Sequence, residues 1–190
     1  MILIVDYGGQ YVHRIWRTLR ELGEDSKIVK PEDAVSEMEA LTPKGIILSG
    51  GPRSVYDSQE GLGDYKALLK SGLPVLGICF GHQLIAQAYG GRVRLGDSGE
   101  YAEVEVMVLD EDCLFRGLPK VLTVWESHRD EVEELPSGFK VLARSDICAI
   151  ESFCALDKPV FGVQFHPEVH HTPEGKSILR NFLSACGGKK

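Results

Sequence analysis

The stretch PVLGICFGHQLIAQAYGG, residues 74–91, decides the fold. It begins with an apolar run of strand length and continues with apolar residues at helical spacing. Between the two parts, Cys79 is flanked by Gly77 and Gly81, in a pattern typical of a sharp turn from a strand into a helix. The stretch therefore predicts a strand, a turn that lifts the cysteine side chain off the sheet, and a helix.

Three further β-branched runs precede this stretch, and helical segments separate them. The runs are residues 1–6, 26–30 and 45–50. The first intervening segment has apolar residues at helical spacing and ends at Gly23. Successive units of this kind form a parallel sheet that is covered by helices on both faces.

After Gly91 the sequence changes to an alternation of polar and apolar residues, which is typical of mixed or antiparallel strands. Such runs occupy residues 101–109, 120–125, 139–145 and 148–156, and a continuous apolar run returns at 159–165. We therefore expect an α/β protein with an open, mostly parallel (flavodoxin-like) central sheet, helices on both faces and an additional antiparallel strand extension.

The end of the sequence predicts one more helix. Apolar residues at helical spacing follow Thr172 and Pro173, which we interpret as the N-cap and the first helical residue. Neither an internal repeat nor a linker interrupts the 190 residues. The sequence therefore predicts a single domain that spans residues 1–190.

The composition of the chain argues against several classes of function. The net charge is -7 and no basic stripe is present to neutralise phosphates, so a nucleic-acid partner is not expected. The apolar run before Asp6 is too short for a signal sequence or a membrane span, so we expect a cytoplasmic protein without membrane association. The five cysteines include no C-x-x-C spacing, which argues against a disulfide framework and against a zinc knuckle.

Cys79 is a candidate nucleophile. At the start of a helix it lies at the positive end of the helix dipole, which favours the nucleophilic thiolate. We expect the backbone N–H of Phe80 to bind an oxyanion, and a second donor is expected from the glycine turn at residues 49–52. The remaining cysteines are interpreted as structural thiols: Cys113, Cys148, Cys154 and Cys186.

A base for this nucleophile is expected from His166. Pro167 favours an extended backbone at His166, and residues at i and i+2 of an extended segment point to the same side, which brings Glu168 beside the imidazole. The carboxyl ends of parallel strands share one edge of a sheet, so Cys79 and His166 are expected to meet there. The alternative is that His166 is a hydrogen-bonded loop histidine without a catalytic role.

Three motifs together resemble the class I (triad) glutamine amidotransferase family. They are LSGGPRS at residues 48–54, GICFGHQLIA at 77–86 and FHPE at 165–168, and the resemblance extends from Met1 to Cys186. It implies an enzyme whose cysteine attacks the carboxamide of glutamine, forms a γ-glutamyl thioester, expels ammonia and is released by water.

The resemblance also implies a role for each matching residue. Cys79 is the implied nucleophile, His166 the general base and then acid, and Glu168 the carboxylate that orients the imidazole. Further implied sites are the oxyanion donors Gly51 and Phe80 and the substrate-binding residue Gln83.

Within the family, three segments are similar to the branch that serves GMP synthase: DYGGQYVHRI, VWESHRDEV and HPEVHHTPEGKSILRNF. This similarity implies that Ser127, His128 and Asp130 lie beside the glutamine pocket or at a partner contact. Arg129 replaces a small glycine that is frequent in the branch, and GEYAEVEV lacks an arginine that often precedes its Glu-Tyr. These departures do not affect the residues implied in the chemistry. They leave the surface that contacts the partner unassigned.

The branch further implies a partner chain. The ammonia is expected to reach an ATP pyrophosphatase that converts xanthosine monophosphate (XMP) to GMP. One domain occupies all 190 residues, so this pyrophosphatase is expected to be a separate chain that carries ATP and Mg. No cofactor and no metal are expected in the present chain.

Three other interpretations stay open. The cluster of His166, Glu168, His170 and His171 is compatible with a metal hydrolase, although Pro167 interrupts the helical spacing that such sites use. A second interpretation is a non-catalytic docking protein. A third is the glutaminase component of another amidotransferase, or a γ-glutamyl peptidase.

Overall fold

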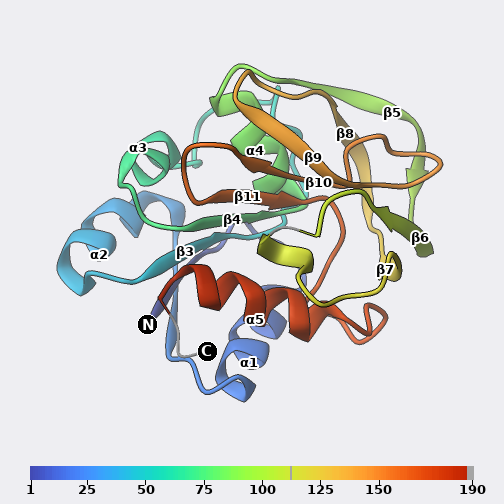
Figure 1. The fold of residues 1–190 in the computed structure, drawn as a ribbon. Helices are drawn as coiled ribbons and strands as arrows, with labels where there is room; N and C mark the ends of the chain where they lie inside the picture. Colours follow the sequence, from blue (N-terminus) through green and yellow to red (C-terminus); the bar gives the residue numbers. More distant parts are fainter. Residues whose placement is uncertain (112, 188–190) are drawn as a thin grey trace.

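The computed structural model describes residues 1–111 and 113–187, which form a central sheet between two layers of helices (Figure 1). Within these residues the sheet has nine strands, in the order β2-β1-β3-β4-β11-β10-β9-β6-β7. The strands that pair in parallel are β2 (Ser26–Val29), β1 (Ile2–Val5), β3 (Gly45–Leu48), β4 (Val75–Ile78) and β11 (Val160–Val163). The antiparallel extension consists of β10 (Ser152–Ala155), β9 (Phe139–Arg144), β6 (Glu103–Val108) and β7 (Val121–Trp125). The predicted fold class is confirmed.

Helices cover both faces of the parallel strands. One face carries α1 (Val12–Glu21) and α5 (Gly175–Ala185), and the other carries α2 (Ala34–Leu41), α3 (Tyr65–Lys70) and α4 (Phe80–Ala88) (Figure 1). Within residues 1–111 and 113–187, no helix is long and apolar enough to cross a membrane.

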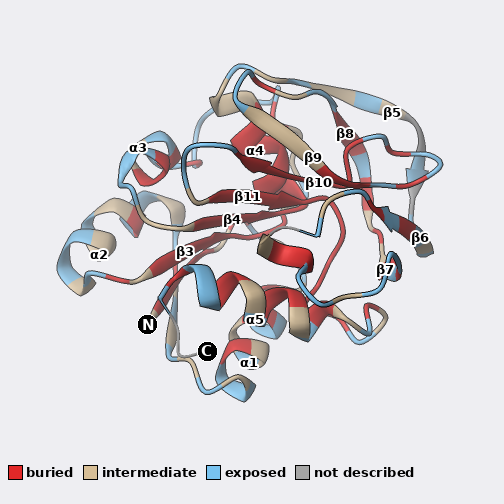
Figure 2. Ribbon diagram, viewed as in Figure 1, coloured by how far each residue is buried: buried red, intermediate tan, exposed pale blue. Residues whose placement is uncertain are grey.

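Strand β1 shows why the sheet is covered twice. Ile2 and Ile4 pack in the cluster that contains the apolar sides of α1 and α5. Leu3 and Val5 pack in the cluster that contains those of α2, α3 and α4. All four side chains are fully buried, and Figure 2 shows the same burial along β4 and β11. A strand buried on both faces requires a continuous apolar run, which the sequence provides here.

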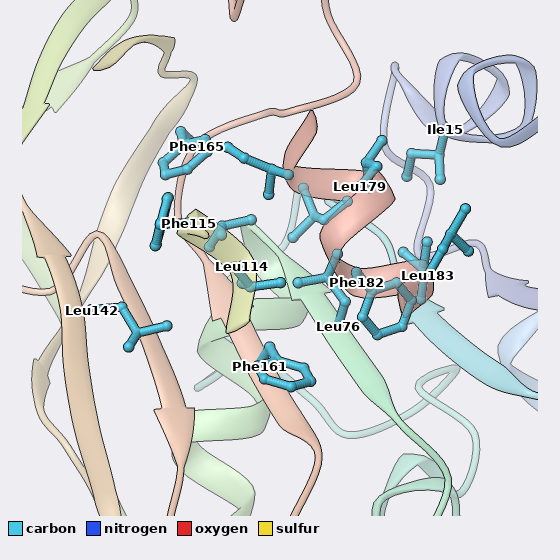
Figure 3. Packing of buried hydrophobic residues seen from close by; sticks show 14 of the residues in the cluster. Ile15, Leu76, Leu114, Phe115, Leu142, Phe161, Phe165, Leu179, Phe182 and Leu183 are labelled. Atoms are coloured by element: carbon cyan, nitrogen blue, oxygen red, sulfur yellow. The ribbon is translucent and has the colours of Figure 1, made fainter. Parts of the chain in front are cut away.

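The core continues from α5 to the antiparallel extension. The rings of Phe161 in β11 and Phe182 in α5 meet edge to face with centroids 6.3 Å apart (Figure 3). A short 3-10 helix, Cys113–Phe115, covers them, and its Leu114 carbonyl accepts a hydrogen bond of 2.8 Å from Asn181 Nδ2. The connection between β6 and β7 is therefore tied to α5. A second 3-10 helix, Pro31–Asp33, precedes α2.

Strands β5 (Arg92–Glu100) and β8 (His128–Glu134) form a separate antiparallel sheet that the sequence did not predict. The two strands are rich in charged residues, so the apolar alternation that reveals a strand is weak in both. Arg94 and Glu131 form an ion pair across the sheet, with Nη2 and Oε1 2.7 Å apart. This small sheet brings the start of β8 toward the end of β4.

The last helix begins later than predicted. Its first residue is Gly175 and its N-cap is Glu174, so Thr172 is not the N-cap and Pro173 is not the first helical residue. The Thr172 hydroxyl instead accepts a hydrogen bond of 3.0 Å from the Trp125 N–H and donates one of 2.7 Å to the His166 carbonyl. Thr172 therefore connects strand β7 to the His166 segment.

Candidate active site

The cysteine turn is formed as predicted and is strained. Cys79 lies between β4 and α4 with φ +52°, a backbone conformation that only glycine adopts freely. A Cβ at Gly77 would lie 2.4 Å from the carbonyl oxygen of Gly81, and a Cβ at Gly81 would lie 2.2 Å from that of Leu48. Both glycines are therefore required by close backbone contacts. The Cys79 N–H donates to the Val163 carbonyl over 2.8 Å, which fixes the turn to β11.

His166 and Glu168 meet as predicted, but not for the predicted reason. Strand β11 ends at Val163, and Pro167 and Glu168 form a turn instead of an extended segment. Proline suits this turn because its φ is fixed near the value that the turn needs. The turn brings His166 Nδ1 to 2.8 Å from Glu168 Oε1, and both side chains are buried. The second oxygen, Glu168 Oε2, has no hydrogen-bond partner among the described residues.

The charge around His166 favours its protonated form. Burial alone would lower the pKa of His166, but the Glu168 carboxylate and the hydrogen-bonded Cys79 sulfur raise it well above its usual range. The Cys79 sulfur also lies 3.9 Å from the carbonyl oxygen of Ser127. Thiol, imidazole and carboxylate therefore form one connected group at the carboxyl ends of β4 and β11.

The two predicted oxyanion donors face the same space. Gly51 and Phe80 both line the cavity that contains Cys79. The turn before Gly51 is fixed by the Ser49 hydroxyl, which accepts from the Tyr7 N–H over 2.9 Å and donates to the Gly50 carbonyl over 2.8 Å. A Cβ at Gly51 would lie 2.7 Å from the Tyr7 carbonyl oxygen, so the backbone approaches closely there.

The amide nitrogen of Gln83 is bound within the protein. Its Nε2 donates to the Asp130 carbonyl over 2.7 Å and to Gln164 Oε1 over 3.1 Å. Because both N–H groups have acceptors, the side-chain carbonyl is the atom that remains to accept a hydrogen bond from a ligand. A ligand that Gln83 holds must therefore present a donor.

Strand β8 supplies another wall. Ser127, His128 and Asp130 line the cavity, and His128 and Asp130 are buried. The Asp130 carboxylate is hydrogen-bonded to the Ser54 hydroxyl. It also interacts with Tyr56, whose pKa is raised by burial and then by this carboxylate. Sequence reasoning did not single out Ser54 or Tyr56, because their contacts with Asp130 join distant parts of the chain.

All predicted site residues therefore meet in one cavity of about 560 Å³. Its walls include Cys79, His166, Glu168, Gly51, Phe80, Gln83, Ser127, His128 and Asp130. Two arginines, Arg53 and Arg129, also line it. An acyl group that reaches Cys79 would lie between a nucleophile, a proton donor and backbone N–H groups.

The histidine cluster does not form a metal site. Within the described part of the chain, no group of three or more histidine, cysteine, aspartate or glutamate side chains is arranged to hold a metal ion. His170 packs against His171 with ring centroids 3.8 Å apart, and His171 Nδ1 lies 2.9 Å from Glu103 Oε1. The geometry gives no support to the metal-hydrolase alternative.

Comparison with known proteins agrees with this geometry. Residues 3–186 match the family described as glutamine amidotransferase class-I. The chain belongs to this family. The class-I glutamine amidotransferase resemblance noted in the sequence is thus confirmed over nearly the whole chain.

Within the family, the chain is similar to several individual proteins and solved structures. The chain is 53% identical over 191 residues to the glutamine-hydrolyzing GMP synthase subunit of Pyrococcus abyssi, covering 98% of this chain and 99% of that protein. It is 50% identical over 190 residues to the protein of the same name from Methanocaldococcus jannaschii, with 100% and 99% coverage. A crystal structure of a putative GMP synthase subunit from Thermoplasma acidophilum superposes with a TM-score of 0.91 at 41% identity, covering 98% and 93% of the two chains. A glutamine amidotransferase from Thermotoga maritima shares the fold, with a TM-score of 0.81 at 21% identity and coverage of 97% and 96%.

Proposed function

We propose that this amidotransferase is the glutaminase subunit of a two-subunit GMP synthase. The observation that carries the proposal is the convergence of Cys79, His166 and Glu168 in one cavity. That convergence occurs in a chain about half identical, over nearly its whole length, to glutamine-hydrolyzing subunits of GMP synthase. The proposed reaction converts glutamine to glutamate and supplies ammonia for the amination of XMP to GMP.

The three side chains divide the work of the proposed reaction. The Cys79 thiolate attacks the carboxamide carbon, and the negative charge moves to the carboxamide oxygen, where the N–H groups of Gly51 and Phe80 donate hydrogen bonds. The His166 imidazolium gives its proton to the departing nitrogen, and ammonia leaves from a γ-glutamyl thioester. His166 then removes a proton from water, which attacks the thioester and frees Cys79 and glutamate. Glu168 holds the imidazole in the correct orientation throughout.

The cavity walls suit the other end of glutamine. The α-ammonium group is a donor, which matches the free carbonyl of Gln83 and the buried carboxylate of Asp130. Ser127 and His128 continue the same wall, so we assign them to the shape of the pocket. These assignments place the carboxamide near Cys79 and the charged end of the amino acid near β8.

The proposal includes a partner and a location. The ammonia acceptor is a separate ATP pyrophosphatase chain that binds ATP and Mg, and the glutaminase itself needs no cofactor for the steps above. We also propose that residues 1–190 form one domain, which the family match over residues 3–186 supports. A cytoplasmic location fits a reaction that consumes ATP and XMP, because both nucleotides are found inside the cell.

Reconstitution tests the proposal. The chain is mixed with a candidate ATP pyrophosphatase, and GMP formation from XMP is measured with glutamine and, separately, with ammonium salt as nitrogen source. We expect the Cys79→Ala variant to lose glutamine-dependent amination while ammonia-dependent amination of the complex stays at the native rate. GMP formation from ammonium alone with the native chain would favour a non-catalytic docking protein.

A further inference from the structure

A buried carboxylate lies behind the β8 wall of the cavity. Glu126 follows β7 and is fully buried. Neither of its oxygens makes a hydrogen bond of ordinary geometry within the described residues, but Oε2 lies 3.2 Å from Nε2 of His128. A buried carboxylate is costly unless a positive charge compensates it. His128, itself buried and on the cavity wall, is the neighbour placed to do so.

The two contacts of the His128 ring fix its hydrogens. Nδ1 lies 3.0 Å from the carbonyl oxygen of Asp130, which is an acceptor only, so Nδ1 carries a hydrogen. Nε2 faces the Glu126 carboxylate, which is also an acceptor when ionised. A hydrogen bond to the Asp130 carbonyl and an ion pair with an ionised Glu126 occur together only when the ring carries hydrogens on both nitrogens, which is the imidazolium form.

We propose that Glu126 is a positioning residue that keeps His128 in the imidazolium form and thereby holds the wall of the glutamine pocket. The Asp130 carbonyl that accepts from His128 also accepts from Gln83 Nε2, over 2.7 Å. Gln83 belongs to α4, the helix that begins directly after Cys79. A chain of contacts therefore connects the buried Glu126 charge to the helix that follows the nucleophile. The identity of the substrate rests on the proposed function, whereas the charge state of His128 does not.

Among the side chains that the structure describes, the other charged groups near the pair leave His128 as the positive partner of Glu126. On β8 and β5, Glu131 is paired with Arg94, and the Asp130 carboxylate faces Ser54 and Tyr56 instead of the imidazole.

The remaining described neighbours lie on α4 and in the segment before and at the start of β10. Burial and then the charge of His128 lower the pKa of His82 to about 3, so His82 stays neutral and does not compensate a carboxylate. Burial, and then Glu151, Glu131 and Glu126, raise the pKa of the Cys148 thiol, so Cys148 adds no negative charge. Glu151 is a second fully buried acid near Cys148.

Loss of this proton has a definite consequence. A neutral imidazole has one hydrogen, so either the Asp130 carbonyl or the Glu126 carboxylate then faces a nitrogen lone pair. The Asp130 carbonyl, which also accepts from Gln83, is then held less firmly. We therefore expect the KM for glutamine to rise at alkaline pH. The kcat changes less, because the contacts from Glu126 through His128 and Asp130 to Gln83 do not include the Cys79 sulfur or the His166 imidazole.

The test measures ionisation and substrate binding separately. In the full chain labelled with ¹⁵N-histidine, His128 is expected to show both ring N–H groups through pH 8. In the Glu126→Gln variant, an amide faces the ring, and we expect His128 to be neutral by pH 7. For the chain with its partner, KM for glutamine at pH 7.5 is expected to rise about tenfold, with its pH inflection moved to lower pH. A merely structural role for Glu126 would not move this inflection.

Two further variants serve as controls. Glu126→Asp keeps a carboxylate and is expected to restore the imidazolium spectrum. Glu105→Gln removes the same charge from an exposed position on β6 and is expected to leave the His128 spectrum and KM unchanged.

Several results would overturn the proposal. A neutral His128 in the native chain at pH 7 would do so, and so would a Glu126→Gln variant whose His128 titrates as in the native chain. A changed spectrum with an unchanged KM profile would remove the positioning role. If Glu126→Gln does not fold, the native titration and the Glu126→Asp variant still decide. If the native chain never hydrolyses glutamine, the proposed function fails while the spectrum still decides the charge state.

Discussion

Replacing Cys79 with glycine is expected to abolish glutamine turnover and to give a more stable fold than replacing it with alanine. Cys79 has φ +52° and ψ -104°, a pair of angles outside the regions that side chains with a Cβ occupy easily. Strain of this kind costs about 1–3 kcal/mol. Glycine removes the strain, but ordering its more flexible backbone costs about 0.5–1 kcal/mol relative to alanine. Cys79→Gly is therefore expected to exceed Cys79→Ala in free energy of unfolding by about 1 kcal/mol.

The alanine variant is the matched control for this comparison. Both variants lose the sulfur and the nucleophile, but only Cys79→Ala keeps a Cβ in the strained conformation. Thermal unfolding measures the difference, which at this chain length corresponds to about 2–4 °C per kcal/mol. In an unstrained turn the order is reversed, because alanine is then the more stable residue. An alanine variant as stable as the glycine variant, or more so, would refute strain at the nucleophile.

Two other substitutions test the geometry. Glu168→Gln removes the carboxylate that raises the pKa of His166, so we expect this pKa to fall in an NMR titration and glutamine hydrolysis to fall by roughly 10³-fold. A raised pKa in the folded state stabilises the protein below about pH 6.5, and this stabilisation is lost as pH rises through the folded-state pKa. Glu168→Gln should flatten that pH dependence of the free energy of unfolding, and an unchanged dependence would contradict the assignment. Gly81→Ala places a Cβ 2.2 Å from the Leu48 carbonyl oxygen, so urea unfolding should show a loss of about 3 kcal/mol, and a variant as stable as the native chain would contradict the close contact.

The fold was predictable wherever local pattern and tertiary contacts agree. The continuous apolar runs that form β1, β3 and β4 are buried on both faces. Their apolar composition alone therefore predicts that they lie in the centre of the sheet. The glycines around Cys79 are required by close backbone contacts, so the sequence pattern correctly predicted the turn and the position of its cysteine. The meeting of Cys79 with His166 followed from the shared edge of parallel strands.

The rest depended on contacts between distant segments. The β5–β8 sheet has charged residues on strands that lie apart from the main sheet, and no apolar alternation marks them. Thr172 has the composition of an N-cap, but its hydroxyl connects Trp125 to His166 instead. Ser54 meets Asp130, 76 residues further along the chain, and a single sequence gives no local signal for such a contact.

The register between β4 and β11 has a consequence for how the enzyme can be controlled. Val163 pairs with Ile78 at the end of the two strands. Cys79 follows Ile78 directly, and His166 lies three residues after Val163. The Cys79 N–H donates to the Val163 carbonyl and the His166 N–H donates to the Trp125 carbonyl, so backbone hydrogen bonds hold both segments to the sheet. We therefore expect a bound protein to tune turnover through the surrounding loops, above all through the segment that begins at Ser127, whose carbonyl contacts the Cys79 sulfur.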